Sequence, residues 1–418
     1  MGEWKTGTIG DLFSLTNGYA FKSADFIESG VPVIKIKNVK AGQFSEHEFS
    51  HVDPRFVQTK PEKLAKTSDL LISMSGNRHD GSPETWVGKV ALFQKSGNYL
   101  INQRVGALRP KNGVEIDILF FSFLLSSMPY QELFISIATS SGGQANLSPN
   151  QILSAPVKYP DLPIQRTIGS LLGTLDDKIE LNRRMNETLE AMARAIFKDW
   201  FVDFGPTRAK AEGRAPYLSP ELWNLFPETL DDDDKPQGWG LGALKDLIVL
   251  QRGFDLPKSI RIPGHYPVVA ASGINGMHNE AKVPGPGVVT GRSGVIGKVF
   301  FIHDDFWPLN TSLWVKAFPN SSPPHAYFLI QMLDFASFNS GSAVPTLNRN
   351  HVHGLPMPIP PKGLVQAFDD LVEPLLERQR QNELQNNTLA QARDLLLPKL
   401  MSGEIRLRDA EKAVEAVA

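Results

Sequence analysis

The sequence predicts an α+β protein in which two similar globular α/β domains are separated by two long antiparallel helices that form an intramolecular coiled coil. Three observations support this fold. Residues 162–204 have the apolar spacing of a long helix, and strand-like runs precede and follow them. The second half of the chain also repeats the first. A repeat of this length predicts two copies of one structural unit, related by a pseudo-two-fold axis.

Composition limits the classes of protein to consider. A chain of 418 residues with 41% hydrophobic residues can build two or more domains. A net charge of −2 argues against a general polyanion binder. The absence of cysteine excludes disulfides, thiolate metal sites and cysteine nucleophiles, and it fits a cytoplasmic location. The N-terminus lacks a signal core, and no run approaches the roughly 18 apolar residues of a membrane span.

The long helix is expected to extend from Thr174 to Phe201, about 28 residues or roughly 42 Å. Gly173 is expected to end a short helix before it. Two polar residues, Asn182 and Asn186, interrupt its apolar stripe. The stripe itself, at steps of three and four residues, consists of Leu172, Leu175, Ile179, Leu189, Ala193, Ile196 and Trp200.

The internal repeat has a constant offset of 200 residues through its most similar part. Leu147, Asn150, Pro156 and Pro160 recur as Leu347, Asn350, Pro356 and Pro360. The helix residues Asn182, Asn186 and Leu189 recur as Asn382, Asn386 and Leu389. Further upstream, Gly88-Lys89-Val90 matches Gly297-Lys298-Val299, and Leu100–Gln103 resembles Pro308–Thr311.

The second helix supplies a partner for the first. Its stripe consists of Val372, Leu375, Leu389, Leu396 and Leu400. Packed together, the two helices would bury apolar surface that each alone would expose. A buried asparagine in such a seam costs stability but fixes register, so the candidates for register are Asn182, Asn186, Asn382 and Asn386. The alternative is that these asparagines lie at a solvated edge. Pro374 is expected in the first turn of the second helix, and Pro398 is expected to end it.

The repeat and the composition together predict five regions. They are a globular domain at 1–160, a helical spacer at 161–205, a linker at 206–238, a second globular domain at 239–360 and a C-terminal helical spacer at 361–418. The mixed strand-like and helical runs within each domain favour a mostly antiparallel or irregular sheet.

No stretch predicts catalysis or metal binding. Gly291–Lys298 resembles a phosphate-binding loop, but its glycine spacing is one residue too long and Val299 replaces the required hydroxyl, so it is interpreted as a strand turn. His351 and His353 lack a third ligand at suitable spacing and are interpreted as part of a polar loop. GxSxG and HExxH motifs are absent, and the sequence predicts neither catalytic residues nor a metal site.

Four stretches carry a resemblance to a known family. They are the helical block 162–206, the closing LLLPKLMSGEIRL at 395–407, Gly10-Asp11-Leu12, and Gly238-Trp239 at the start of the second half. With these features the whole chain resembles the DNA-specificity subunit of type I restriction–modification enzymes. The resemblance implies two target-recognition domains, each binding one half of a bipartite site in double-stranded DNA. It also implies helices that set the unread spacer and dock two methyltransferase subunits.

The resemblance further implies that this chain is non-catalytic and binds no cofactor. S-adenosylmethionine for DNA methylation, and ATP and Mg for cleavage, are expected in the methyltransferase and the restriction/translocase subunits.

Candidate DNA contacts are chosen by side-chain chemistry, because Arg, Lys, Asn, Gln, Ser and Thr suit base edges in the major groove. In the first domain they are Lys35, Lys37, Asn38, Asn77, Arg78, His79, Gln103, Arg104, Asn146 and Ser148. In the second they are Arg252, Lys258, Arg292, Ser293, Thr311, Ser312, Asn348 and Arg349. Lys89 and Lys298, at equivalent places in the repeat, are expected to contact phosphates.

Three alternatives stay open from the sequence. The chain could serve a combined restriction–methylation enzyme that cuts beside its site. It could be a coiled-coil scaffold presenting two domains that bind other ligands, such as sugars or proteins, and it would then lack DNA affinity. It could also be an enzyme whose site has no recognisable motif.

Overall fold

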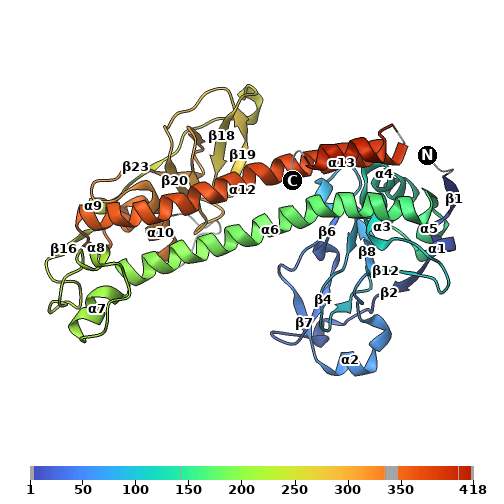
Figure 1. Ribbon diagram of the computed structural model, residues 1–418, viewed down its shortest axis with the longest axis horizontal. Coiled ribbons are helices and arrows are strands. Elements are labelled where there is room, and N and C mark those ends of the chain that lie inside the picture. The colour runs from blue at the N-terminus through green and yellow to red at the C-terminus, as the bar shows by residue number, and fades with distance from the viewer. Residues whose placement is uncertain (1–3, 142, 334, 336–346, 403, 416–418) are drawn as a thin grey trace. The chain divides into compact units, whose positions relative to one another are not determined.

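The computed structural model describes residues 4–141, 143–333, 335, 347–402 and 404–415, and its chain divides into two compact units. The first unit comprises Met1–Asn182 and Glu383–Ala418, and the second is the continuous stretch Arg183–Asn382. Each unit therefore contains one globular domain and one half of each long helix. Figure 1 shows these helices, α6 and α12, as the longest ribbons of the chain.

Both long helices are longer than the sequence predicted. Helix α6 (Leu162–Phe201) has 40 residues and α12 (Lys362–Ser402) has 41, so each would be about 60 Å long. The expected break at Gly173 is wrong, because this glycine serves close packing. A Cβ there would lie 2.8 Å from Cδ2 of Leu119. Pro374 and Pro398 both lie inside α12, where each costs a backbone hydrogen bond without ending the helix.

In the first unit the helix halves pair in antiparallel fashion. Asn182 Nδ2 donates to Asn386 Oδ1 at 3.0 Å and to Gln385 Oε1 at 2.8 Å. Further along, Arg393 Nη1 donates to Asp176 Oδ1 at 2.6 Å. Moving back along α6 therefore means moving forward along α12, which is the antiparallel order predicted from the repeat.

The second unit contains the repeat-equivalent contact. Asn382 Nδ2 donates to Asn186 Oδ1 at 2.7 Å, and Gln379 Nε2 donates to the Asn186 carbonyl oxygen at 2.8 Å. Asn182 and Asn382 are only 2% and 1% exposed, so neither lies at a solvated edge. The asparagines thus form hydrogen bonds across the seam. Their role in fixing register stays a prediction.

A four-stranded antiparallel sheet with the same strand order forms the centre of each domain. In the first domain the order across the sheet is β10 (Val90–Leu92), β8 (Leu70–Ser73), β12 (Val105–Pro110) and β2 (Phe13–Asn17). In the second it is β21 (Val299–Ile302), β20 (Gly287–Gly291), β23 (Ser312–Ala317) and β17 (Val249–Arg252). The repeated sequence therefore specifies a repeated topology.

Smaller sheets follow the same plan in both domains. The strand before the first short helix pairs with the strand that leads into the long helix, so that β1 (Lys5–Thr8) pairs with β15 (Pro156–Tyr159), and β16 (Gly240–Ala243) with β24 (Pro356–Ile359). Each domain also has one parallel pair, β4 (Val31–Ile34) with β11 (Leu100–Ile101), and β18 (Tyr266–Ala270) with β22 (Trp307–Pro308). The remaining strands are β3 (Phe26–Ile27), β5 (Val39–Lys40), β6 (Gln43–Phe44), β7 (Ser50–Val52), β9 (Ser75–Gly76), β13 (Thr139–Ser141), β14 (Gln144–Asn146) and β19 (Gly273–His278).

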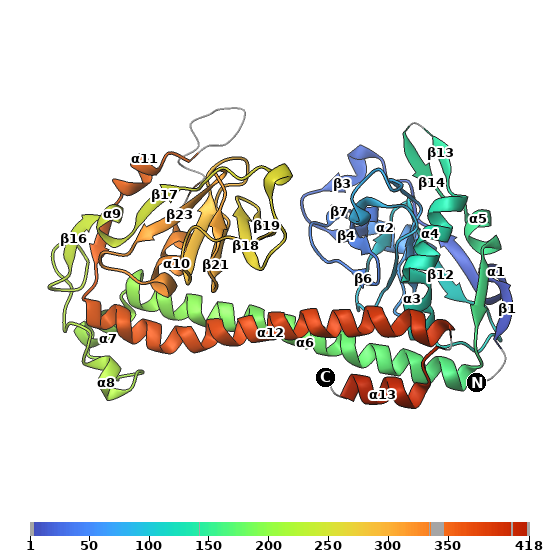
Figure 2. The ribbon, with the colours of Figure 1, turned by 90° about the horizontal axis from the view of Figure 1, so that it is seen from above.

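The other α-helices of the described residues are short. In the first unit they are α1 (Ile9–Leu12), α2 (Arg55–Thr59), α3 (Ile118–Ser126), α4 (Met128–Ile137), α5 (Pro149–Ser154) and α13 (Leu407–Glu415). In the second they are α7 (Gly205–Ala211), α8 (Pro220–Trp223), α9 (Leu244–Leu247), α10 (Pro323–Met332) and α11 (Arg349–His353). In Figure 2, α10 lies between the central sheet of its domain and the helix segments of its unit.

The core of each unit includes side chains from both long helices. In the first, Leu389, Leu396 and Leu400 of α12 join the core of a domain more than 200 residues earlier in the chain. In the second, Trp200 of α6 packs with Phe226 at a ring distance of 5.1 Å. The predicted linker at 206–238 is therefore partly folded, since it contains α7, α8 and the buried Phe226.

Among the described residues, no single helix is both long and apolar enough to cross a membrane. Helices α3 and α4 reach that length and composition only as a pair, and the chain bends by 65° between them.

In each unit an aspartate lies where a short helix of the domain, α3 or α10, packs against a long helix. The aspartate belongs to the domain in the first unit and to the long helix in the second. In the first unit Asp117 caps α3, accepting from Phe120 N at 2.7 Å, and Gly169 of α6 lies directly beside it. In the second unit Ser322 caps α10, and its hydroxyl donates to Oδ1 of Asp369 on α12 at 2.7 Å. Asp369 is buried, and this burial raises its pKa to about 6.

We expect Asn186→Ala to lower the free energy of unfolding by about 1–3 kcal/mol, because it leaves the buried amide of Asn382 without its acceptor. Urea unfolding of the full chain measures the change. Asn387→Ala is the matched control, since Asn387 is an exposed asparagine of α12, the helix that contains Asn382, and its loss should shift the transition by less than about 0.5 kcal/mol. Equal shifts for the two variants would contradict a special role for the buried pair.

We expect Asp369→Asn to stabilise the chain above pH 6. The folded pKa of about 6 lies above the ordinary value of 3.8, so the charged carboxylate is disfavoured in the folded state. This penalty is fully present above pH 6 and fades as the pH falls towards 4. The asparagine keeps an oxygen for Ser322 and removes a penalty of up to roughly 3 kcal/mol. Urea unfolding at pH 8 and pH 4.5 tests this, and an equal gain at both pH values would contradict the assignment.

Candidate functional site

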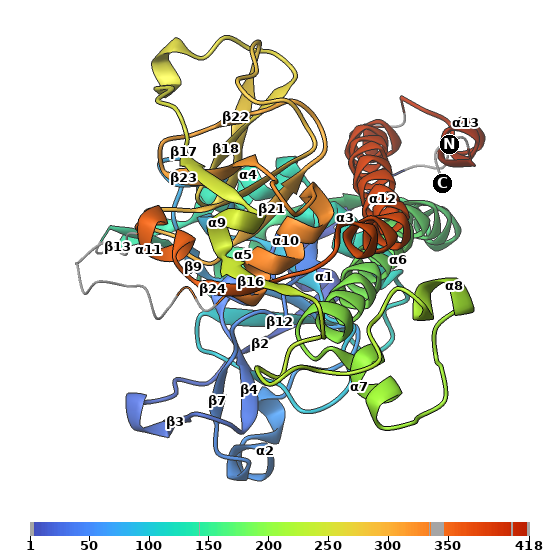
Figure 3. The same cartoon turned by 90° about the vertical axis from the view of Figure 1, so that its left-hand side faces the viewer.

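Three segments come together at the same place in each domain, and we call them the loop site. In the first domain they are residues 74–79, residues 102–104, and the described part of the hairpin segment, which is 139–141 and 143–147. Met74 N donates to the Arg104 carbonyl oxygen at 2.9 Å, and Leu147 N donates to the Met74 carbonyl oxygen at 2.9 Å. Figures 2 and 3 show the β13–β14 hairpin on the side of this domain that faces away from the helix segments of its unit.

The second domain repeats this backbone arrangement at residues 292–294, 309–311 and 347–349. Arg292 N donates to the Thr311 carbonyl oxygen at 2.9 Å, and Leu347 N donates to the Arg292 carbonyl oxygen at 2.9 Å. Arg104 therefore corresponds to Thr311. The sequence comparison, which placed Gln103 opposite Thr311, is wrong by one residue, because the connection from Lys89 to β11 is two residues longer than that from Lys298 to β22, whereas the comparison allowed for one.

Arg104 is at the centre of a polar network in the first loop site. Its Nη1 donates to Ser75 Oγ at 2.8 Å and to Gln144 Oε1 and Asn146 Oδ1 at 3.3 Å each. Ser75 Oγ in turn donates to Asn146 Oδ1 at 2.7 Å. Sequence reasoning selected Arg104 and Asn146 but missed Ser75 and Gln144. Gln144 could have been found, since it is two residues from Asn146 and shares its strand face.

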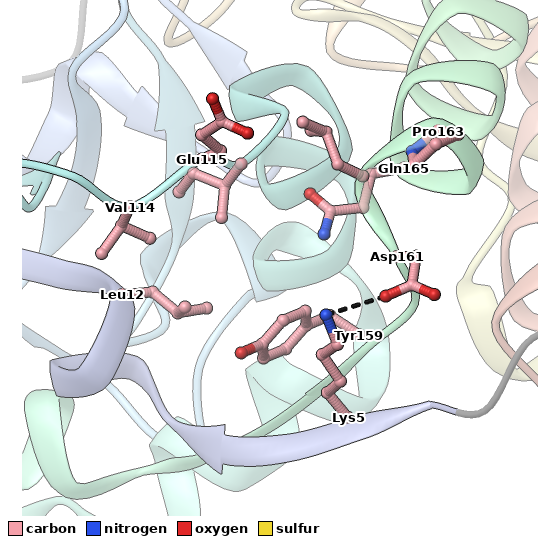
Figure 4. A pocket seen from close by; sticks show the side chains of 10 residues that line it. Lys5, Leu12, Val114, Glu115, Tyr159, Asp161, Pro163 and Gln165 are labelled. Atoms are coloured by element: carbon pink, nitrogen blue, oxygen red, sulfur yellow. Dashed lines mark ion pairs between the residues drawn. The ribbon is translucent and has the colours of Figure 1, made fainter.

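A cavity lies elsewhere in the first unit, where α6 begins (Figure 4). It measures about 510 Å³, and an ion pair of 2.8 Å between Lys5 and Asp161 borders it. The buried amide of Gln165 is already occupied, because Oε1 accepts from Asp117 N at 2.9 Å and Nε2 donates to the Pro160 carbonyl oxygen at 2.8 Å. These polar groups hold the start of α6 against its domain.

The described part of the chain contains no group of three or more His, Asp or Glu residues that could hold a metal ion. Of the two histidines considered from sequence, His353 accepts from Leu250 N at 2.9 Å through Nε2. Burial lowers its pKa, so it is held neutral in a structural contact between α11 and β17.

A family model for the type I restriction modification DNA specificity domain matches residues 1–191 and 236–386. Each match covers one globular domain and much of the long helix that follows it, and together they account for well over half of the chain. The chain belongs to the type I restriction–modification DNA specificity family.

Two curated relatives and one solved structure agree with this membership. The specificity subunit of type I restriction enzyme HindI from Haemophilus influenzae is 25% identical over 97% of this chain and 100% of its own length. The specificity subunit of type I restriction enzyme MjaIX from Methanocaldococcus jannaschii is 26% identical over 97% of this chain and 94% of its own length. The crystal structure of a type I S subunit from M. genitalium has a TM-score of 0.57 at 17% identity, covers 96% of both chains, and supports the fold.

In a DNA specificity subunit the loop sites are the candidate DNA interfaces, and several residues predicted from sequence lie in or beside the first one. Asn77, Arg78 and His79 follow β9, but all three already have protein partners. Asn77 Nδ2 donates to Thr85 Oγ1 at 3.0 Å, Arg78 Nη2 donates to the Ala138 carbonyl oxygen, and His79 Nε2 lies 2.8 Å from Glu132 Oε2. These side chains shape the loop between β9 and β10.

The other first-domain candidates differ in whether their side chains already interact with other protein groups. Gln103 is exposed, whereas Ser148 caps α5 in a reciprocal pair with Gln151. Lys37 is exposed and forms an ion pair with Glu48 at 3.1 Å. Lys35 Nζ donates to Ser50 Oγ at 2.8 Å, and burial lowers its pKa.

Asn38, Lys89 and Ser312 are buried, so the structure contradicts their prediction as DNA contacts. Asn38 Nδ2 donates to the carbonyl oxygens of Ser45 and His47, at 3.0 and 3.1 Å. Ser312 Oγ donates to the Leu309 carbonyl oxygen at 2.7 Å. These polar side chains satisfy buried backbone groups, a role that residue type alone does not reveal.

Lys89 and Lys298 are equivalent in backbone but not in side chain. Both carbonyl oxygens accept from the neighbouring central strand, from Ser73 N at 2.9 Å and Gly291 N at 3.3 Å. Lys89 is only 4% exposed, its Nζ donates to the Glu84 carbonyl oxygen, and burial lowers its pKa to about 8. Lys298 is exposed. A phosphate contact is therefore open to Lys298 but not to Lys89, so the expected equivalence of the two lysines is wrong.

The second loop site presents a different set of side chains. Arg292 Nη1 donates to the Asn310 carbonyl oxygen at 3.0 Å, and Thr311 Oγ1 accepts from Ala271 N at 3.4 Å. Asn348 caps α11 by accepting from Asn350 N at 3.0 Å. The partly exposed or exposed candidates in this domain are Arg252, Lys258, Arg292, Ser293, Thr311, Asn348 and Arg349.

Proposed function

We propose that each globular domain of this specificity subunit recognises one half of a bipartite, asymmetric DNA site, and that the paired helices set the spacer between the halves. One observation carries the proposal. The same backbone arrangement carries different side chains in the two domains: exposed Arg104 beside buried Met74 in one, and exposed Thr311 beside partly exposed Arg292 in the other. A repeated frame with unlike side chains suits two unlike base sequences.

The helices are suited to carry partner subunits as well as to set a distance. Arg183, Arg184 and Glu187 of α6 are exposed. We propose that this face of the paired helices docks two methyltransferase subunits. Those subunits would supply S-adenosylmethionine and methylate DNA, and restriction subunits would add ATP- and Mg-dependent cleavage, while this chain remains non-catalytic. A scaffold that binds sugars or proteins is disfavoured by membership of the DNA specificity family.

The spacer proposal predicts the effect of lengthening both helices together. Four residues added after Asn182 and four after Asn382 would extend both helices at the two sequence positions where one unit ends and the other begins. Each insertion adds about 6 Å. The unread spacer should therefore lengthen by one to two base pairs, because DNA rises about 3.4 Å per base pair. Neither half-sequence should change.

The measurement is sequencing of methylated genomic DNA after co-expression with the cognate methyltransferase. Four residues inserted after Gly213, between α7 and α8, are the control and should leave the spacer unchanged. An insertion in α6 alone should impair stability, because it shifts Asn186 relative to Asn382. An unchanged spacer in an active double-insertion variant would contradict the proposal.

A further inference from the structure

We propose that Arg104 recognises a guanine in the half-sequence bound by the first domain, and that Ser75, Gln144 and Asn146 are positioning residues that aim its side chain. This inference rests on the proposed function, in which the first domain binds one half of the DNA site.

The side chain of Arg104 is both exposed and held. Its three hydrogen bonds, to Ser75, Gln144 and Asn146, all start from Nη1. A guanidinium group is planar, so fixing one nitrogen orients the rest of the fork. Ser75 is 4% exposed, and its hydroxyl is itself oriented by Asn146 at 2.7 Å. The network therefore joins an exposed cation to a buried hydroxyl.

The backbone of Arg104 is fixed as well. Its carbonyl oxygen accepts from Met74 N at 2.9 Å, and the next residue, Val105, donates its N–H to the Asn102 carbonyl oxygen at 2.9 Å. Asn146 and Gln144 come from β14, which pairs with β9 through Ala145 and Gly76. Three segments distant in sequence thus position one side chain. Such pre-organisation reduces the conformational entropy that binding would cost.

A second arginine, on the strand β12 that follows Arg104, shows what a purely structural arginine does in this domain. Arg109 is bound by the carboxylate of Asp69 through Nε and Nη2, both at 2.8 Å, and Asp69 is buried. Its charge is therefore compensated within the protein. The hydrogen-bond partners of Arg104 are neutral oxygens instead, so they orient its fork without neutralising its charge. That combination suits recognition of a polyanion.

Guanine is the base whose edge fits this fork. Its O6 and N7 are two adjacent acceptors in the major groove, and a bidentate arginine matches them. Adenine places an amino donor beside N7, and neither pyrimidine offers two such acceptors. The equivalent residue of the second domain, Thr311, is too short for a bidentate contact. Arg104 should therefore act on the first half-sequence alone.

The test compares methylated-site motifs of the intact complex carrying wild-type chain, Arg104→Ala, Arg104→Lys, Ser75→Ala or Gln144→Ala. Arg104→Ala should lower the preference for guanine at one position of one half-sequence by about 10- to 100-fold. Arg104→Lys should keep the charge but not restore the preference, because lysine lacks the fork. Ser75→Ala and Gln144→Ala should relax the same position by smaller factors. A general loss of stability would not confine its effect to one base.

Arg55→Ala is the matched control, since Arg55 is an exposed arginine elsewhere in the first domain. It should leave the motif unchanged. A bipartite motif that keeps every position in both Arg104 variants would overturn the assignment of Arg104 and leave the proposed function intact. A wild-type motif that is not bipartite would overturn the proposed function itself. Relaxation at an adenine or pyrimidine would overturn the choice of guanine.

Discussion

The antiparallel packing of helix halves within each unit is the constraint on which the rest of the structure depends. The first unit is built from two segments at opposite ends of the chain, Met1–Asn182 and Glu383–Ala418. Leu389, Leu396 and Leu400 belong to its core, so this core is complete only when residues 383–400 pack against the first domain. The hydrogen bonds between Asn182 and Asn386, and between Asn186 and Asn382, repeat the same polar contact in both units.

In this arrangement the two domains share a backbone framework but differ in the side chains that it carries. The central sheet has the same strand order in both domains, and the backbone bonds around Met74 and Arg292 are alike. The side chains held by that frame are unlike. Under the proposed function, such a frame changes the bases that it recognises through a few exposed loop side chains and leaves the helices unaltered.

The sequence was sufficient for the fold because the repeat is visible in residues with strong structural roles, such as Leu147, Leu347 and the seam asparagines. Helix continuity was mispredicted at Gly173, where local propensity could not reveal the nearby Leu119. The sequence also could not distinguish an exposed lysine from a buried one, as Lys89 and Lys298 show. Ser75 was missed because its contact with Asn146 joins residues 71 positions apart.

The central claim is that the two domains bind separate halves of one DNA site through a common frame. Its most direct test replaces residues 239–360 with the corresponding domain of the Haemophilus influenzae relative and maps the methylated site of the complex. We predict that the first half-sequence is retained and only the second changes. A change in both half-sequences, or in neither, would contradict the claim.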